Sequence, residues 1–220
     1  MIFQDGDKIV FAGDSVTDAG SSAPVSEAFK DNLGFGYVRM VDIFMNVWYP
    51  ELKVRVVNSG IGGNDTRNLL ARFQTDVVDQ NADWVSICIG INDVWRQFDM
   101  PANESRHIAV DEYESNLEKM ICMVKDNVKG MFILTPYYIE PNAEDEMRAL
   151  MDKYGEVCKK LAKKYNCVLV DFQKIFSDYC KYRHSTYVAW DRVHPGMTGG
   201  TLMAREFLKY CGFDFSKIAE

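Results

Sequence analysis

The sequence predicts an α/β fold in which a parallel β-sheet carries helices on both of its faces. Short apolar runs rich in β-branched residues recur along the 220 residues, and each is followed by a stretch with apolar residues at helical spacing. Parallel strands need a crossover between them, most often a helix, so this alternation is typical of a sheet covered on both sides. Because no repeat, low-complexity tract or Pro/Gly/Ser-rich linker interrupts the pattern, we expect a single domain over residues 1–220.

Five segments have the length and composition of buried strands. The first, K-I-V-F-A, is rich in β-branched and aromatic residues and ends at Gly13, and the third, W-V-S-I-C-I, is closed by Gly90. The second runs into a cluster of glycines, and the fourth stops at Pro136, which has no N–H group to continue a ladder. The predicted strands are residues 8–12, 53–58, 84–89, 131–135 and 167–171.

Between and after these strands, apolar residues recur three or four positions apart, as one face of a helix requires. Leu69, Phe73 and Val77 form such a face after the second strand, and the helix predicted after the third opens with acidic residues, which stabilise a helix start. The predicted helices are residues 37–48, 66–78, 111–128, 143–165 and 197–210, with a shorter one after the fifth strand.

The charge balance excludes some classes of partner. The formal net charge is −7 and the isoelectric point is near 5.1, which argues against electrostatic capture of nucleic acid or of an anionic lipid surface. A membrane-spanning helix needs a run of roughly eighteen apolar residues, and the sequence has no such run.

The cysteines and the first residues of the chain bear on the compartment. The six cysteines form no C-x-x-C pair, and two of them lie inside predicted strands, which favours reduced core residues over disulfides. The sequence runs almost at once into its first strand and lacks the pattern of a signal peptide. We therefore expect a cytoplasmic protein. With only three histidines in the chain, no metal site is expected.

Polar residues and glycines suited to chemistry follow three of the predicted strands. They are G-D-S (residues 13–15), N-S-G-I-G-G-N (58–64) and G-I-N-D (90–93). Taken singly, each is explained as well or better by a helix cap or a tight turn. Since the carboxyl ends of parallel strands meet at one edge of a sheet, however, the three loops are expected to lie together. A serine hydroxyl, glycine amides and an asparagine amide would then face one crevice.

A fourth feature supplies a base. Asp191 stands three residues before His194, ahead of the last predicted helix, and Pro195 and Gly196 follow. On a turn, the carboxylate can accept a hydrogen bond from one ring nitrogen and leave the other free to take a proton. Single aspartates and histidines are usually surface residues, so this interpretation depends on the four features occurring together.

Four blocks of the sequence resemble the signature blocks of the SGNH (GDSL-type) hydrolases. They are F-A-G-D-S-V-T-D (residues 11–18), G-I-G-G-N (60–64), G-I-N-D (90–93) and D-R-V-H-P (191–195), in the family's order and over almost the whole chain. The resemblance implies a flavodoxin-like three-layer α/β/α sandwich with a five-stranded parallel sheet. It also implies a serine esterase that needs no metal or organic cofactor.

By position in these blocks, the resemblance implies a role for each of five residues. Ser15 is the expected nucleophile, and Asp191 and His194 complete its triad. Gly63 and Asn92 are expected to donate hydrogen bonds to the oxyanion, together with the N–H group of the serine. Gly60 and Gly62 are close neighbours of Gly63 and are the alternatives for the glycine donor.

A closer resemblance is to intracellular bacterial acetyl xylan esterases of this class. The stretches that carry it include G-F-G-Y-V (residues 34–38), G-I-N-D-V-W-R-Q (90–97), T-P-Y-Y-I-E (135–140) and A-W-D-R-V-H-P (189–195). This resemblance implies hydrolysis of acetyl esters on xylan-derived oligosaccharides, or of other short-acyl esters. Residues in the segments 20–32 and 181–187 depart from that subgroup.

Three residues are candidates for contact with the substrate. Asp14 stands beside the expected nucleophile, and Trp95 and Trp190 adjoin two of the blocks. A tryptophan ring can pack against a sugar, but packing in the core or at an interface is an equally good interpretation. Related esterases often assemble, so the resemblance is compatible with a homo-oligomer, although no patch in the sequence predicts one.

Other functions fit parts of the pattern. A lysophospholipase or thioesterase with the same triad would favour long acyl chains, and a carbohydrate-binding module would use the fold without catalysis. The complete set of triad and oxyanion residues disfavours the binding module. Nucleotide binding is disfavoured because neither the G-x-G-x-x-G spacing nor a P-loop lysine is present.

Overall fold

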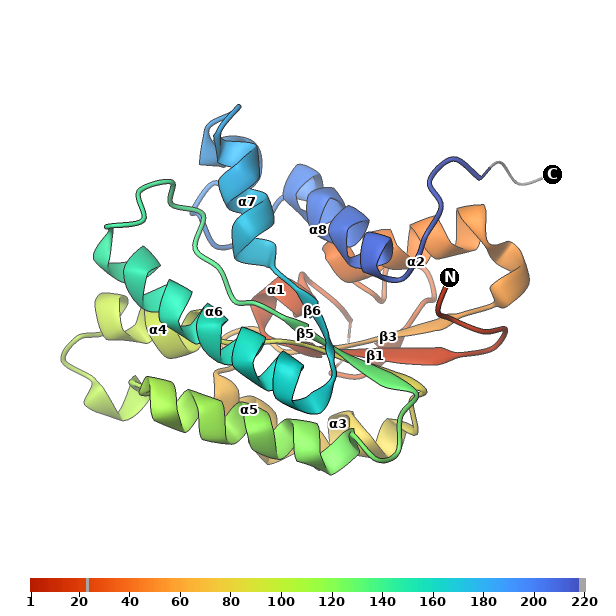
Figure 1. Cartoon of the computed structure of the whole chain (residues 1–220), viewed down its shortest axis with the longest axis horizontal. Helices are drawn as coiled ribbons and strands as arrows, with labels where there is room; N and C mark the ends of the chain where they lie inside the picture. The colour runs from red at the N-terminus through yellow and green to blue at the C-terminus, as the bar shows by residue number, and fades with distance from the viewer. Residues whose placement is uncertain (23, 218–220) are drawn as a thin grey trace.

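The structure, a computed structural model, describes residues 1–22 and 24–217 and has a β-sheet as its central layer (Figure 1). All five predicted strands are present, and neighbouring ones pair in parallel. The parallel sheet expected from the alternation of strands and helices is therefore confirmed. The strands are β1 (Lys8–Gly13), β3 (Arg55–Gly60), β4 (Trp84–Cys88), β5 (Gly130–Leu134) and β6 (Val168–Val170), in the spatial order β3-β1-β4-β5-β6.

The prediction of a five-stranded sheet is one strand short. The sixth, β2 (Ser26–Glu27), pairs antiparallel with β3 at the edge of the sheet. With two residues in a polar segment, β2 has no apolar alternation by which a sequence reveals a strand. The carboxylate of Glu27 joins it to β3 by accepting two hydrogen bonds from Arg55, at 2.6 and 3.2 Å.

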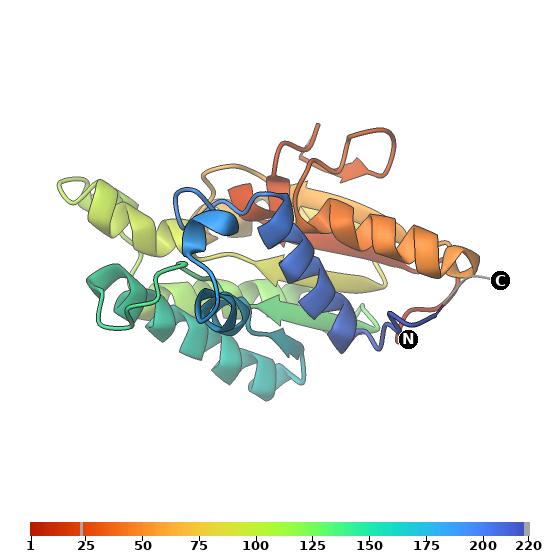
Figure 2. The ribbon, with the colours of Figure 1, turned by 90° about the horizontal axis from the view of Figure 1, so that it is seen from above.

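Helices cover both faces of the sheet (Figures 1 and 2). On one face α2 (Tyr37–Trp48) and α8 (Met197–Tyr210) pack against each other, and the bounds of both match the prediction. On the other face α5 (Val110–Val124) packs between α3 (Thr66–Asp76) and α6 (Glu146–Tyr165). None of the helices within residues 1–22 and 24–217 is long and apolar enough to cross a membrane.

Three shorter helices each follow a strand closely, namely α1 (Ser15–Asp18), α4 (Ile91–Asp99) and α7 (Phe172–Cys180). The last is the short helix expected after the fifth strand. The sequence does not predict α4, because Asn92 and Asp93 are two of its four buried residues and interrupt the apolar periodicity. Single turns of 3₁₀ helix lie at Pro50–Leu52, Val78–Gln80, Glu104–Arg106 and Ser185–Tyr187.

Aromatic packing holds α8 against the sheet. Phe207 of α8 is fully buried, and its ring centroid lies 4.5 Å from that of Phe132 on β5 and 5.1 Å from that of Phe11 on β1. Aromatic side chains bury more surface than other residues, so such a cluster contributes strongly to the stability of the core. Because α8 begins three residues after His194, this packing also limits where that histidine can lie.

The three central strands end at the same level. In the register of the sheet, Gly13 of β1 lies opposite both Gly60 of β3 and Cys88 of β4. Both glycines are required by close approaches of the backbone: a Cβ atom on Gly13 would lie 2.4 Å from the carbonyl oxygen of Cys88, and one on Gly60 would lie 2.1 Å from the amide nitrogen of Asp18. The loops that follow these strands therefore start side by side.

Two carboxyl groups are buried under these loops. Asp14 is 1% exposed and caps α1 by accepting the N–H group of Val16 at 2.9 Å. Asp93, which is 0% exposed, accepts hydrogen bonds from the N–H group and the hydroxyl of Thr66 and so ties α4 to the start of α3. Burial raises the pKa of each group to about 7, and for Asp14 the charge of Asp93 adds to the effect.

Replacing Gly60 with alanine is expected to destabilise the fold, because the added methyl group would collide with the backbone of α1. Overpacking of this kind costs roughly 1–3 kcal/mol, measurable as a lower midpoint of urea unfolding. The matched control is Gly155→Ala in α6, where a Cβ atom meets nothing within 4 Å. It should be neutral or stabilising by up to about 1 kcal/mol, since alanine favours a helix. Equal stability of the two variants would contradict the close approach of β3 and α1.

Asp14→Asn is expected to change how stability depends on pH. Because burial raises the pKa of Asp14 from 3.8 to about 7, the folded state binds more protons than the unfolded state between these values. Wild-type stability should therefore fall as pH rises through this window, by up to about 1.4 kcal/mol per pH unit for one such group, and level off above it. The variant lacks this titration but keeps an oxygen for the Val16 amide.

Urea unfolding of both proteins at a series of pH values measures the effect. The variant should gain stability relative to wild type as the pH rises from about 4 to about 7, in line with the shift of Asp14. Gly155→Ala, which changes no titratable group, is the control and should run parallel to wild type. If the difference in the free energy of unfolding between wild type and Asp14→Asn did not vary with pH, the Asp14 carboxyl group would not have a raised pKa.

Candidate active site

Ser15 lies where β1 gives way to α1, and its hydroxyl faces the imidazole of His194. The Oγ atom of Ser15 is 2.9 Å from Nε2 of His194, although 179 residues separate the two in the chain. Since Ser15 is the first residue of α1, its N–H group lies outside the hydrogen-bond ladder of the helix. No acceptor for this N–H group is found in the described part of the chain. The hydroxyl of Ser15 is thus hydrogen-bonded to a ring nitrogen, and its backbone N–H group is unpaired among the described residues.

Asp191 holds the other side of the imidazole. One carboxylate oxygen lies 2.6 Å from Nδ1 of His194, and the other accepts the N–H groups of Val193 and His194 at 3.0 and 2.8 Å. Burial acts to raise the pKa of Asp191, but the hydrogen bonds from the ring and from the two amides outweigh it and lower the pKa. Because the carboxylate is charged at neutral pH, the proton of the neutral ring lies on Nδ1, and Nε2 accepts from the serine.

The turn that carries the histidine is fastened to the loop after β5. Tyr137 donates its hydroxyl to the carbonyl oxygen of Val193 at 3.1 Å, and the N–H group of Ile139 donates to that of Arg192 at 2.9 Å. The guanidinium of Arg192 also pairs with the carboxylate of Glu140. Arg192 has a φ of +65°, a left-handed conformation that is unfavourable for a residue other than glycine. These contacts hold it there and fix the path of the turn.

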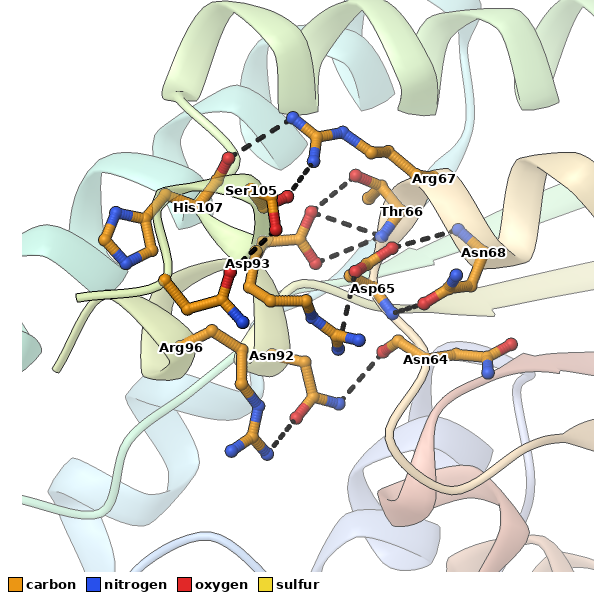
Figure 3. Close-up of polar contacts among 12 residues, drawn as sticks. Asn64, Asp65, Thr66, Arg67, Asn68, Asn92, Asp93, Arg96, Ser105 and His107 are labelled. Carbon is orange, nitrogen blue, oxygen red and sulfur yellow. Dashed lines mark hydrogen bonds and ion pairs between the residues drawn. The ribbon is translucent and has the colours of Figure 1, made fainter. Parts of the chain in front are cut away.

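Asn92, the second residue of α4, presents its amide to the loop that follows β3. Its Nδ2 atom donates to the carbonyl oxygen of Asn64 at 2.9 Å, and its Oδ1 atom accepts from the guanidinium of Arg96 at 2.9 Å (Figure 3). The side chain is 2% exposed, so these contacts restrict it closely. Only one of the two Nδ2 hydrogens is used in them, and the second is left to donate.

The loop after β3 has two unpaired amides. The N–H groups of Gly60, Ile61 and Asn64 each donate within the protein, at 2.9, 3.1 and 3.2 Å. For Gly62 and Gly63 no acceptor is found among the residues that the structure describes. The loop can therefore offer one or both of these amides to a negatively charged oxygen.

The two glycines differ in their surroundings. A Cβ atom on Gly62 would lie 4.0 Å from that of Ser15, whereas one on Gly63 would meet nothing within 4 Å. Gly63 has a φ of +78°, a conformation that favours glycine. Gly62 and Gly63 are thus the two glycines of the loop with unpaired amides among the described residues, and Gly63 as the oxyanion donor stays a prediction.

The two candidate tryptophans also differ. Trp95 is partly buried, with its ring centroid 6.0 Å from that of His194 and 4.8 Å from the guanidinium carbon of Arg96. Trp190, directly before Asp191, is 82% exposed. Trp95 therefore packs against the imidazole, whereas Trp190 presents its ring to solvent.

The burial of Asp14 argues against the expected contact with the substrate, which stays a prediction. Its carboxyl group is enclosed by the protein and caps the helix on which Ser15 lies. The sequence shows that an aspartate precedes the serine, but it does not show that the side chain turns inward. In this structure Asp14 shapes the site from beneath and offers it no surface.

An apolar cavity of about 290 Å³ opens beside the serine and the histidine. Its walls include Val16, Phe35 and Met197 as well as Ser15 and His194. The apolar side chains in its walls suit an acyl chain or the apolar face of a ring. Among the described residues, no group of three or more His, Cys, Asp or Glu side chains is placed to hold a metal ion.

Sequence reasoning missed the residues that position this site. The contacts of Tyr137 and Glu140 join segments more than 50 positions apart, and no periodicity or spacing signals such a pair. Arg96 is different, because it stands four residues after Asn92, the spacing of neighbours on a helix face. That signal would have found the contact once α4 was predicted to be a helix.

Comparison with known proteins places the chain in a family. Residues 11–202 match the GDSL-like lipase/acylhydrolase family, in agreement with the four blocks of the sequence. The acetylxylan esterase of Geobacillus stearothermophilus is 47% identical over 210 residues, which are 96% of this chain and 96% of that protein.

Solved structures agree with this match. Axe2, an acetylxylan esterase from Geobacillus stearothermophilus, is 46% identical over 97% of this chain and 98% of its own, with a TM-score of 0.95. LAE5, an alpha/beta hydrolase enzyme from the metagenome of Lake Arreo in Spain, is 43% identical over 96% of this chain and 98% of its own, with a TM-score of 0.94. Because sequence and fold agree over nearly the whole length, this chain belongs to the GDSL-like lipase/acylhydrolase family.

Proposed function

We propose that this chain is a serine carbohydrate esterase that removes O-acetyl groups from xylan-derived oligosaccharides through an acetyl-enzyme on Ser15. The observation that carries the proposal is the hydrogen-bonded row from Ser15 through His194 to Asp191, with distances of 2.9 and 2.6 Å. A serine hydroxyl bonded to a base that is itself oriented by a carboxylate is the arrangement that nucleophilic acyl transfer requires.

In the first half of the reaction, Oγ of Ser15 bonds to the carbonyl carbon of the acetyl group while Nε2 of His194 takes the hydroxyl proton. The electron pair of the carbonyl bond moves to its oxygen, and Asp191 stabilises the imidazolium that forms. When that pair returns, the bond to the sugar oxygen breaks. The sugar oxygen takes the proton from Nε2, and the acetyl group stays on the serine.

In the second half, water attacks the acetyl-enzyme while His194 takes its proton, and acetate leaves as the proton returns to Ser15. The oxyanion of both halves is held by the N–H group of Ser15, a glycine amide and the second Nδ2 hydrogen of Asn92. Gly63 is our first candidate for the glycine donor and Gly62 the second. The unpaired state of these donors in the described residues supports the assignment.

Relatives support the substrate and the three triad residues. Axe2 is described as an acetylxylan esterase and as an acetyl-xylooligosaccharide esterase. Its solved catalytic mutants are S15A, D191A and H194A, and this chain has serine, aspartate and histidine at the same three numbers. We take the acetylated sugar and these roles from that agreement.

Trp95 and Trp190 are proposed to border the sugar. The exposed ring of Trp190 can stack on a sugar or on a second copy of the chain, so it also bears on whether the protein forms the homo-oligomer with which the resemblance is compatible. Kinetics and sedimentation of Trp190→Ala separate these roles: contact with sugar predicts a higher KM at unchanged mass, and contact between copies predicts a lower mass.

We also propose that the protein works in the cytoplasm. All six of its cysteines are free thiols in the structure. Free thiols are typical of proteins kept in a reducing compartment, whereas disulfides persist in secreted ones.

A lipolytic esterase with the same triad is the second candidate, and the apolar cavity of about 290 Å³ beside Ser15 is the observation that favours it.

We expect nitrophenyl esters to be cleaved fastest as acetate or propionate, with a steep loss of activity for longer acyl chains, since the proposed substrate carries acetyl groups. Measured kcat/KM over a series of chain lengths decides. A maximum at eight or more carbons, roughly, would replace the acetyl esterase with the lipolytic enzyme and leave the triad in place.

Ser15→Ala should reduce hydrolysis about 10⁶-fold, as loss of a triad serine does, whereas Asn92→Ala should reduce it roughly 10²- to 10³-fold, as loss of one oxyanion donor does. The measurement is acetate release from acetylated xylo-oligosaccharides. Ser216→Ala, at an exposed position, is the matched control and should behave as wild type.

Comparable rates for wild type and Ser15→Ala would end the proposal. Labelling with a fluorophosphonate gives an independent answer, because it modifies only an activated serine. Absence of label on Ser15 in the wild-type protein would favour a carbohydrate-binding module without catalysis.

A further inference from the structure

Arg96 lies one turn after Asn92 on α4 and reaches back to its amide. The guanidinium donates to Oδ1 of Asn92 at 2.9 Å, and the arginine side chain is only 16% exposed (Figure 3). On the far side of the amide, Nδ2 donates to the carbonyl oxygen of Asn64. The asparagine is therefore held at both ends, by a cation on one side and by the loop that follows β3 on the other.

These two partners select one orientation of the amide. A guanidinium can only donate a hydrogen bond, and a carbonyl oxygen can only accept one. If the Asn92 amide turned over, its NH₂ group would face the donors of Arg96 and its oxygen would face the oxygen of Asn64. The contact with Arg96 thus keeps Nδ2, and with it the unused hydrogen, on the side of the loop.

The arginine is itself clamped. Its guanidinium carbon lies 4.8 Å from the ring centroid of Trp95, and the group also forms an ion pair with Asp99. With its own position fixed, the charged group acts on the asparagine as a rigid support. A positive charge beside Oδ1 also draws electron density from the amide, which strengthens the N–H groups as donors.

We propose that Arg96 is a positioning residue for the oxyanion hole, which orients and polarises the Asn92 amide so that its free Nδ2 hydrogen meets the developing negative charge. This inference rests on the proposed function. Its energetic effect falls on the transition state, because the charge on the oxygen forms there and not in the bound ester.

The test is Arg96→Met, which keeps the length of the side chain and removes its charge and donors. We expect kcat for nitrophenyl acetate to fall about 10- to 100-fold, less than the full loss of an oxyanion donor, with KM within about twofold of wild type. Arg96→Lys keeps a charged donor and should retain more activity than Arg96→Met. Binding of an alkylboronic acid, which forms a tetrahedral anion on serine, should weaken in parallel with kcat/KM.

A matched control comes from Arg106. Arg96 and Arg106 both line a surface depression of about 860 Å³, but Arg106 makes no contact with Asn92 among the described residues. Arg106→Met should behave as wild type. An equal loss in Arg106→Met would mean that the charge of the depression matters and the amide contact does not. Wild-type kinetics of Arg96→Met would likewise overturn the proposal.

A double-mutant cycle shows whether Arg96 acts through the asparagine. On an Asn92→Ala background, Arg96→Met should cost little further activity, whereas a multiplicative loss would contradict a role through Asn92. Titration with a fluorophosphonate counts the folded active sites in each variant. If Arg96→Met does not fold, the same cycle is run with Arg96→Lys. If Arg96→Met does not behave as expected but Ser15→Ala is inactive, only the role of Arg96 is overturned. If Ser15→Ala is active, the proposed function itself is overturned.

Discussion

The register of the three central strands is the constraint on which the rest of the structure depends. Gly13 lies level with Gly60 and Cys88, and side chains at the two glycine positions would collide with neighbouring backbone. The strand ends are therefore packed too closely to shift independently. Because the nucleophile, the glycine loop and α4 all start from this line, their relative positions follow from backbone pairing in the sheet.

The histidine reaches the site by a different route. No strand carries it, and its position depends on α8, whose Phe207 packs on Phe132 in the core, and on hydrogen bonds from the loop after β5. Sheet register thus places the serine, the glycine loop and Asn92, while helix packing and polar contacts place the imidazole. Two buried carboxyl groups support the first of these parts from beneath: Asp14 caps the helix of the serine, and Asp93 ties α4 to α3.

The sequence predicts those parts of the fold that have a period. Apolar runs locate all five parallel strands, and helical spacing places α2 and α8 with their observed ends. It cannot predict β2, because this strand consists of two residues in a polar segment and forms only by pairing with β3. It cannot predict α4 either, because half of the buried residues of that helix are polar. In the site, the rule that strand ends meet locates the loops of Ser15 and Asn92. Which way Asp14 turns, and which glycine amide stays unpaired, depend on contacts through space that no spacing encodes.

The 179 residues between Ser15 and His194 have a consequence for synthesis of the protein. A growing polypeptide that has left the ribosome only as far as β5 already contains the serine, the glycine loop and the asparagine, but not the imidazole. Its serine is then an ordinary alcohol with no base to activate it. Activation of the serine would therefore begin only after α8 has folded onto the sheet and brought His194 to the site.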